Sequence, residues 1–177
     1  IVHEELAACD PGFTLSYLAH SMLFANNLYV NGNDAQRAKY LPDACAGRTV
    51  CGMCMSEPDA GTDVLGLRTT ARKKGDLYVL DGSKTFITNG SEAETLVVYA
   101  RTHPALDAHG ISVFLVDGKA SGFSCSKKLD KMGMRGSPTA ELRFDAVRVP
   151  VADRLGEENR GVAMMMRLQA NARIHAV

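Results

Sequence analysis

The hydrophobic period changes twice along the 177 residues of this chain, which limits the folds available to it. Residues 1–48 carry apolar side chains at helical spacing, residues 49–152 alternate short apolar runs with turns, and a helical pattern resumes after Gly161. The pattern predicts an α+β protein, in which a helical segment precedes an all-β barrel or sandwich and a second helical segment follows. We therefore expect the end of an N-terminal helical domain at 1–48, a middle β domain at 49–152, and the start of a C-terminal helical domain at 153–177.

Turn and capping residues divide the first part into separate helices. One helix is expected from 14 to 30, where leucines and alanines recur at helical spacing. Asn33 should cap the next helix, with Gln36 at the capping-box position. This second helix should end at Tyr40, because the residue before Pro42 is disfavoured in the helical conformation.

The middle part contains predicted strands of two kinds. The segments 95–100 and 111–116 are continuous apolar runs, typical of strands buried on both faces. The segment 141–145 alternates apolar and charged residues, so one of its faces should meet solvent. A shorter strand is expected at 77–80, with Asp81-Gly82 as the turn that ends it.

The charge balance of the chain disfavours two classes of partner. Lys and Arg together number 20, Asp and Glu also number 20, and the formal net charge is +0. A nucleic-acid-binding protein usually carries a basic excess, and an acidic membrane surface attracts one. Since the sequence also contains no apolar run long enough to cross a bilayer, we expect no nucleic-acid partner and no membrane span.

The cysteines could in principle mark a metal or redox site. Cys51 and Cys54 have the C-x-x-C spacing of such motifs. A second cysteine pair and a histidine pair at ligand spacing are both missing from the sequence. We therefore expect two strand residues and no metal site. The odd total of 5 cysteines has no framework spacing, which indicates reduced thiols.

Three motifs carry most of the functional information. Residues 54–66 read CMSEPDAGTDVLG, a strand end that runs into a loop rich in Pro and Gly. Such loops expose backbone N–H groups and small hydroxyls toward ligands, although an ordinary surface turn has the same composition. Residues 84–90 read KTFITNG, and residues 128–137 read KLDKMGMRGS.

In their order and spacing, these motifs resemble the signatures of the acyl-CoA dehydrogenase family, and are most similar to its isovaleryl-CoA type. The string M-S-E-P-x-A-G-T-D-x-x-G is filled at every position, and the resemblance covers residues 4–166. It implies a flavoprotein oxidoreductase of fatty acid metabolism and leucine catabolism that binds FAD and an acyl-CoA thioester. It further implies α,β-dehydrogenation of a short branched acyl chain, electron transfer to an electron-transfer flavoprotein, a homotetramer, and a location in the mitochondrial matrix or the bacterial cytoplasm.

The resemblance also assigns roles to residues of the motifs. The cofactor-binding residues that it implies are Met53, Cys54, Met55, Ser56, Gly61, Thr62, Phe86, Ile87 and Thr88. Thr62 would also contact the thioester, and Arg135 would belong to the substrate side of the site unless its loop is only a tight connection between strands. Fixed donors on Ser56 and the backbone around it would stabilise negative charge on the reduced flavin. Many relatives have Trp at position 86, and Phe keeps the stacking face without the indole N–H.

The catalytic base that the resemblance implies has no counterpart here. In the isovaleryl type, a Glu directly precedes an Arg on the helix after the β domain. Counted from Gly161, that Arg is Arg173 and the base position holds Ala172, which cannot accept a proton. Glu57 is expected to be a hydrogen-bonded loop carboxylate and not the base. We therefore expect no catalytic residue in the chain.

Two explanations of the C-terminal residues stay open. Residues 167–175 also resemble a later family segment of the form R-L-L-R-D-A-R-I, so a domain could have dropped out near Met166–Arg167, and simple divergence is the alternative. On either explanation we expect a fragment of a longer enzyme. The competing functions are a catalytically inactive acyl-CoA-binding or assembly module of the same fold, and an acyl-CoA oxidase.

Overall fold

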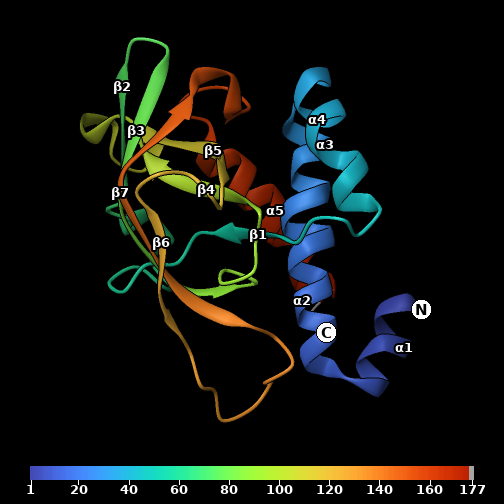
Figure 1. The fold of residues 1–177 in the computed structure, drawn as a ribbon. Helices are drawn as coiled ribbons and strands as arrows, with labels where there is room; N and C mark the ends of the chain where they lie inside the picture. The colour runs from blue at the N-terminus through green and yellow to red at the C-terminus, as the bar shows by residue number, and fades with distance from the viewer. Residues whose placement is uncertain (176–177) are drawn as a thin grey trace.

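The computed structural model describes the backbone of residues 1–175 and the side chains of these residues except 108, 169 and 171–175. The α- and π-helices are α1 (Val2–Cys9), α2 (Pro11–Leu18), the π-helical η1 (Ala19–Asn26), α3 (Asn27–Asn31), α4 (Asp34–Cys45) and α5 (Gly161–His175), and short 3-10 helices are η2 (Val64–Gly66), η3 (Pro104–Gly110) and η4 (Val151–Asp153). The strands are β1 (Cys51–Cys54), β2 (Thr70–Lys74), β3 (Leu77–Thr88), β4 (Thr95–Arg101), β5 (Ile111–Asp117), β6 (Phe123–Lys128), β7 (Thr139–Pro150) and β8 (Arg154–Leu155). The predicted order of helices, then strands, then a helix is confirmed (Figure 1).

The strands form an eight-stranded sheet in the order β6-β7-β3-β2-β4-β5-β8, with β1 parallel to β4. Strand β2 joins the two halves of the sheet, and its pairing with β4 is limited to Thr70 and Arg101. Side chains from both halves share one buried cluster, in which the rings of Tyr78 and Phe114 lie 4.8 Å apart. The sheet therefore folds over on itself around a core, in agreement with the predicted barrel or sandwich.

The other face of β4 and β5 packs against the helices. Tyr99 and Val113 from these strands share a second buried cluster with Phe24, Leu28 and Met165 from the helices. Both faces of the two central strands are thus covered, which confirms the interpretation of their continuous apolar runs. Figure 1 shows α1 to α4 gathered on one side of the sheet, with β1 between them and the other strands.

The turn predicted at Asp81-Gly82 is wrong, because β3 continues through it to Thr88. Its pairing with β7 shifts register between Leu80 and Gly82, so the Asp-Gly pair forms a bulge. The Asp81 carboxylate accepts the backbone N–H of Ala146 at 2.8 Å, which satisfies a donor on the partner strand. A glycine that permits unusual backbone angles serves a bulge as well as a turn, and only the partner strand decides between them.

The helix predicted to end at Tyr40 also runs further, with Pro42 inside α4. The helix then ends near Gly47, whose φ of 68° is left-handed and whose N–H donates to Ala44 O at 3.1 Å. Ala44 is buried and its carbonyl is 3.0 Å from His20 Nε2, so packing against η1 holds the last turn that Pro42 weakens.

The helix predicted at 14–30 begins three residues earlier, at Pro11, because Asp10 caps it by accepting the N–H groups of Gly12 and Phe13. The capping box predicted for Asn33 and Gln36 is confirmed. Within the described residues, none of the helices has the length and apolar character needed to cross a membrane.

Candidate functional site

The candidate site lies where the loop after β1 meets the middle of β3. The backbone N–H of Thr85 donates to Ser56 O at 2.9 Å, and Lys84 Nζ donates to Met55 O at 3.1 Å. These two bonds fasten consecutive carbonyls of the first motif to consecutive residues of the second. The structure therefore joins two motifs that are distant in the sequence into one surface.

Glu57 and Lys84, one from each of the two motifs, form a buried ion pair at this junction. Lys84 Nζ lies 2.9 Å from Glu57 Oε1, and the side chains are 0% and 6% exposed, respectively. Glu57 also accepts the backbone N–H groups of Arg68 at 2.6 Å and Thr69 at 3.0 Å. The prediction that Glu57 is a hydrogen-bonded loop carboxylate is confirmed. The role of Lys84 was missed, because the polar residues around it in the sequence give no sign that its side chain is buried.

Burial and the partner's charge have opposing effects on the pKa values of Glu57 and Lys84. Burial alone would raise the pKa of the Glu57 carboxyl, but the Lys84 charge and the N–H groups of Thr69 and Arg68 hold that pKa below its usual value. Burial lowers the pKa of the Lys84 ammonium, and the Glu57 charge opposes this change. Glu57 is thus held ionised, which makes it a poor acceptor for a substrate proton.

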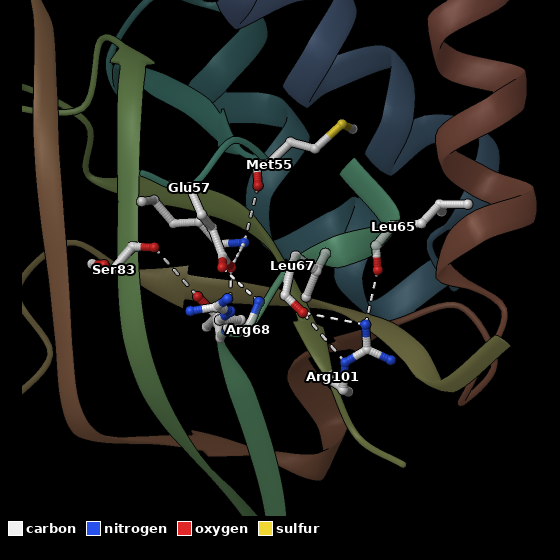
Figure 2. Close-up of polar contacts among 9 residues, drawn as sticks. Met55, Glu57, Leu65, Leu67, Arg68, Ser83 and Arg101 are labelled. Carbon is white, nitrogen blue, oxygen red and sulfur yellow. Dashed lines mark hydrogen bonds and ion pairs between the residues drawn. The ribbon is translucent and has the colours of Figure 1, made fainter. Parts of the chain in front are cut away.

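The far end of the loop is held by Arg101 from the end of β4. Its guanidinium donates to Leu65 O at 2.8 Å and to Leu67 O at 3.2 and 3.3 Å (Figure 2). The segment between Met55 and Thr69 is therefore fixed at its start by Lys84 and at its end by Arg101 and Glu57. A loop held in this way can present its backbone in one arrangement.

Above the ion pair, the surface offers an aromatic ring and hydroxyl groups. Phe86 is 70% exposed and has a φ of 56°, and the β3–β7 pairing shifts register between Lys84 and Ile87. The bulge turns this ring outward, where its face is open to contact with another molecule. Ser56 and Thr88 are half-buried, and Gly61 and Thr62 are exposed.

Other residues that were predicted to contact the flavin have side chains directed toward the protein interior. The side chains of Cys54, Met55 and Ile87 are buried, and Met53 is half-buried. These residues can meet a ligand only through backbone atoms or, for Met53, part of the side chain. Burial raises the pKa of the Cys54 thiol to about 12.

The prediction that Cys51 and Cys54 are strand residues is confirmed, since both lie buried in β1. Burial raises the pKa of the Cys51 thiol to about 11, so neither thiol is activated as a nucleophile or ligand. Among the side chains that the structure describes, no cluster of His, Cys, Asp and Glu could hold a metal ion.

The third motif approaches the second at Asn89. This residue has a φ of 63°, and its N–H donates to Pro138 O at 2.8 Å. Its side-chain amide donates to Ser16 O at 3.0 Å and to Cys51 O at 3.1 Å, so it links α2, β1 and the β6–β7 loop. Sequence reasoning missed this role, although Asn is among the residues that adopt left-handed angles readily.

Arg135 lies on the same β6–β7 loop, but its contacts are local. Its guanidinium donates to Lys131 O at 2.8 Å and lies 3.4 Å from Asp130 Oδ1. Neither contact joins it to Thr62, the other residue predicted on the substrate side. In Figure 1 the loop reaches the start of α2, where a Cβ on Gly12 would lie 3.0 Å from Gly136 N.

Comparison with known proteins identifies the family. The acyl-CoA dehydrogenase middle-domain model matches residues 52–147, and the N-terminal-domain model matches residues 1–48. This chain belongs to the acyl-CoA dehydrogenase family. Members of this family are oxidoreductases. The middle-domain match contains the junction of the first and second motifs around Ser56 and Phe86, which we call the Ser56–Phe86 surface.

Individual acyl-CoA dehydrogenases support this assignment. The mitochondrial isovaleryl-CoA dehydrogenase of Pongo abelii is 48% identical over 94% of the chain and 40% of its own length. The solved butyryl-CoA dehydrogenase of Megasphaera elsdenii is 40% identical, with a TM-score of 0.95 over 98% of the chain and 45% of that structure.

A third similar chain was solved in work on the electron transferring flavoprotein of Acidaminococcus fermentans and flavin-based electron bifurcation. It is 42% identical, with a TM-score of 0.92 over 94% of the chain and 44% of its own. The present chain thus spans less than half the length of each of these three proteins.

The acyl-CoA dehydrogenase base position predicted at Ala172 lies on α5. The side chain of Ala172 is outside the part of the chain that the structure describes, so its surroundings do not bear on the alignment. On the same helix, Met164 and Met165 are buried against the sheet.

Proposed function

We propose that this acyl-CoA dehydrogenase binds FAD on the Ser56–Phe86 surface and takes part in α,β-dehydrogenation of a short branched acyl-CoA. The observation that carries the proposal is the fastening of the first motif to the second above a buried ion pair, with Phe86 exposed beside it. FAD would supply the hydride acceptor, and the protein would supply orientation and fixed dipoles.

The residues of the surface fit a flavin. An isoalloxazine ring needs an apolar face to pack on and donors directed at its polar edge. Phe86 offers such a face, and the hydroxyls of Ser56 and Thr88 lie at the same junction, only partly exposed. Thr62, exposed further along the loop, would contact the thioester, and Arg135 would lie on the substrate side.

The catalytic base lies outside this surface in our proposal. A base must reach the α-proton in its ionised form and then accept it. Glu57 is buried, paired with Lys84 and bonded to two backbone N–H groups, so protonating it would break those contacts. Ala172, at the aligned base position, has no group that accepts a proton.

Related proteins support the finer points of the proposal. The isovaleryl-CoA and butyryl-CoA dehydrogenases favour a short acyl chain, and the similarity to the first favours a branched one. The similar chain from the flavoprotein study favours an electron-transfer flavoprotein as the electron acceptor. We further propose a homotetramer that acts in the mitochondrial matrix, as the name of the isovaleryl-CoA relative suggests, or in the bacterial cytoplasm.

The flavin site is tested by truncating the exposed ring. Phe86→Ala should weaken FAD binding about tenfold, because stacking contributes about 0.5–1.5 kcal/mol. The matched control is Phe13→Ala, which removes another exposed ring, 52% exposed on α2. Titration of the flavin-free protein with FAD measures both affinities. Equal affinities for the two variants would contradict the proposed position of the flavin.

The reaction is tested by adding isovaleryl-CoA to the FAD-loaded protein without oxygen. Loss of the flavin absorbance would establish dehydrogenation, and the same test with butyryl-CoA would report the preferred chain. The alternative of an inactive acyl-CoA-binding module is favoured by Ala172. It predicts thioester binding without bleaching. The other alternative, an acyl-CoA oxidase, predicts rapid reoxidation of the reduced flavin in air.

A further inference from the structure

Lys84 has an environment that hydrophobic burial does not explain. Its side chain is fully buried, and its ammonium group donates to one carboxylate oxygen and one backbone carbonyl. Removing two charges from water is costly, and an apolar pair of similar size is often at least as stable. The pair is therefore a weak source of stability, and its geometry suggests another role.

The bond from Lys84 fixes the orientation of one particular peptide group. In a planar trans peptide, the carbonyl of one residue and the N–H of the next point in opposite directions. Because Met55 O points to Lys84 Nζ at 3.1 Å, the N–H of Ser56 is directed away from the buried pair. The next carbonyl, Ser56 O, is bound by the N–H of Thr85 at 2.9 Å, so the neighbouring peptide is fixed as well.

Glu57 completes this arrangement from the other side. It follows Ser56 directly, holds Lys84 in place at 2.9 Å, and binds the returning end of the loop through Arg68 and Thr69 (Figure 2). Lys84 itself is two residues before Phe86 on β3. One buried pair thus connects the Ser56 donor, the loop and the strand that carries the exposed ring.

We propose that Glu57 and Lys84 are a positioning pair, which aims the Ser56 N–H and sets its place relative to Phe86 for contact with an isoalloxazine ring. The inference rests on the proposed function, and it assigns these two residues a role through the backbone, without contact to the flavin. A pair that served stability alone could be replaced by neutral residues without loss of FAD affinity.

The experiment compares Lys84→Met with the double variant Glu57→Gln/Lys84→Met in the purified full protein. Removing Lys84 alone leaves a buried carboxylate without its cation, whereas the double variant leaves no unpaired charge and keeps an oxygen acceptor for the loop. We expect the double variant to fold with a melting temperature close to that of the unchanged protein. We expect it to bind FAD about tenfold or more weakly, as for a lost, well-aligned hydrogen bond.

A second readout follows the peptide group itself. Addition of FAD should slow exchange of the Ser56 amide hydrogen in the unchanged protein, and should slow it less in the double variant, since the orientation of this N–H is no longer fixed. Lys39→Met is the matched control, because Lys39 also pairs with a carboxylate, Asp153, at 3.3 Å but is exposed on α4. This control should leave FAD affinity and Ser56 exchange unchanged.

The outcomes separate the inference from the proposed function. If the unchanged protein binds FAD and the folded double variant binds it equally well, the positioning role is wrong and the proposed function stands. If the double variant does not fold, the pair maintains the fold, and the positioning role is equally overturned. If the unchanged protein binds no FAD, the proposed function fails, and the inference fails with it.

Discussion

Gly82 shows how a single residue determines the course of β3. Its φ is 150°, and an added Cβ would lie 2.8 Å from the Cα and Cβ of Thr69. We expect Gly82→Ala to lower the free energy of unfolding by about 2–4 kcal/mol, from backbone strain and overpacking together. Gly133→Ala is the control, because a Cβ there meets nothing within 4 Å and should change stability by less than about 0.5 kcal/mol. Urea unfolding measures both, and equal effects would show that the bulge tolerates a side chain.

At the same scale, Glu57 should make stability depend on pH. Burial acts to raise the pKa of Glu57, but Lys84 and the loop N–H groups keep it below the usual value. The contribution of Glu57 to the free energy of unfolding is therefore present above its unfolded-state pKa of about 4.3, and it is lost as pH falls through its pKa in the folded state. The sign of the pH dependence in this acid range follows from the lowered pKa of Glu57.

The measurement is urea unfolding of Glu57→Gln beside the unchanged protein from pH 7 to pH 3. At pH 7 the variant should be less stable by about 3–5 kcal/mol, because it leaves Lys84 buried without a counter-charge. This difference should shrink as pH falls through the folded pKa of Glu57. Glu92→Gln is the control, since Glu92 pairs with Lys128 at 2.8 Å in an exposed position and should matter little at any pH. A stability difference between Glu57→Gln and the unchanged protein that stayed constant from pH 7 to pH 3 would show that folding does not lower the pKa of Glu57.

At the scale of elements, the buried side chain of Gln36 attaches α4 to the segment that follows β7. Gln36 Nε2 donates to Ala152 O at 2.8 Å, just after β7, and to Arg154 O at 2.9 Å, at the start of β8. Gln36→Ala should cost about 2–3 kcal/mol, because it leaves these partly buried carbonyls without their donor and also breaks the capping box. Asn33→Ala removes the cap alone and should cost about 1 kcal/mol. Thermal unfolding compares the two, and equal costs would mean that the attachment to the sheet contributes nothing.

At the scale of the whole molecule, the helices leave apolar side chains in solvent. Those with large exposed fractions on α2 and α3 are Phe13, Leu15, Tyr17, Tyr29 and Val30. A polypeptide of these 177 residues should therefore self-associate at micromolar concentration. Sedimentation velocity measures this, and the double variant Phe13→Ser/Tyr29→Ser should shift the population toward monomer. If the unchanged polypeptide is monomeric, these exposed side chains do not cause self-association.

Periodicity and capping are local properties, so the order of the elements, the central strands and the capping box at Asn33 could be predicted from the sequence alone. Its resemblance to the acyl-CoA dehydrogenase family was confirmed by the family models. The domain boundaries and the flavin-binding residues stay predictions.

Features that depend on distant partners could be read only from the folded chain. Asp81-Gly82 became a bulge because β7 pairs across it, and α4 passed Pro42 because its last turn packs on η1. Lys84 pairs with Glu57 because β3 lies against the loop after β1. The physical reason is that a residue's local preference is weak, whereas burial and hydrogen bonding with remote residues exceed it once the chain has folded.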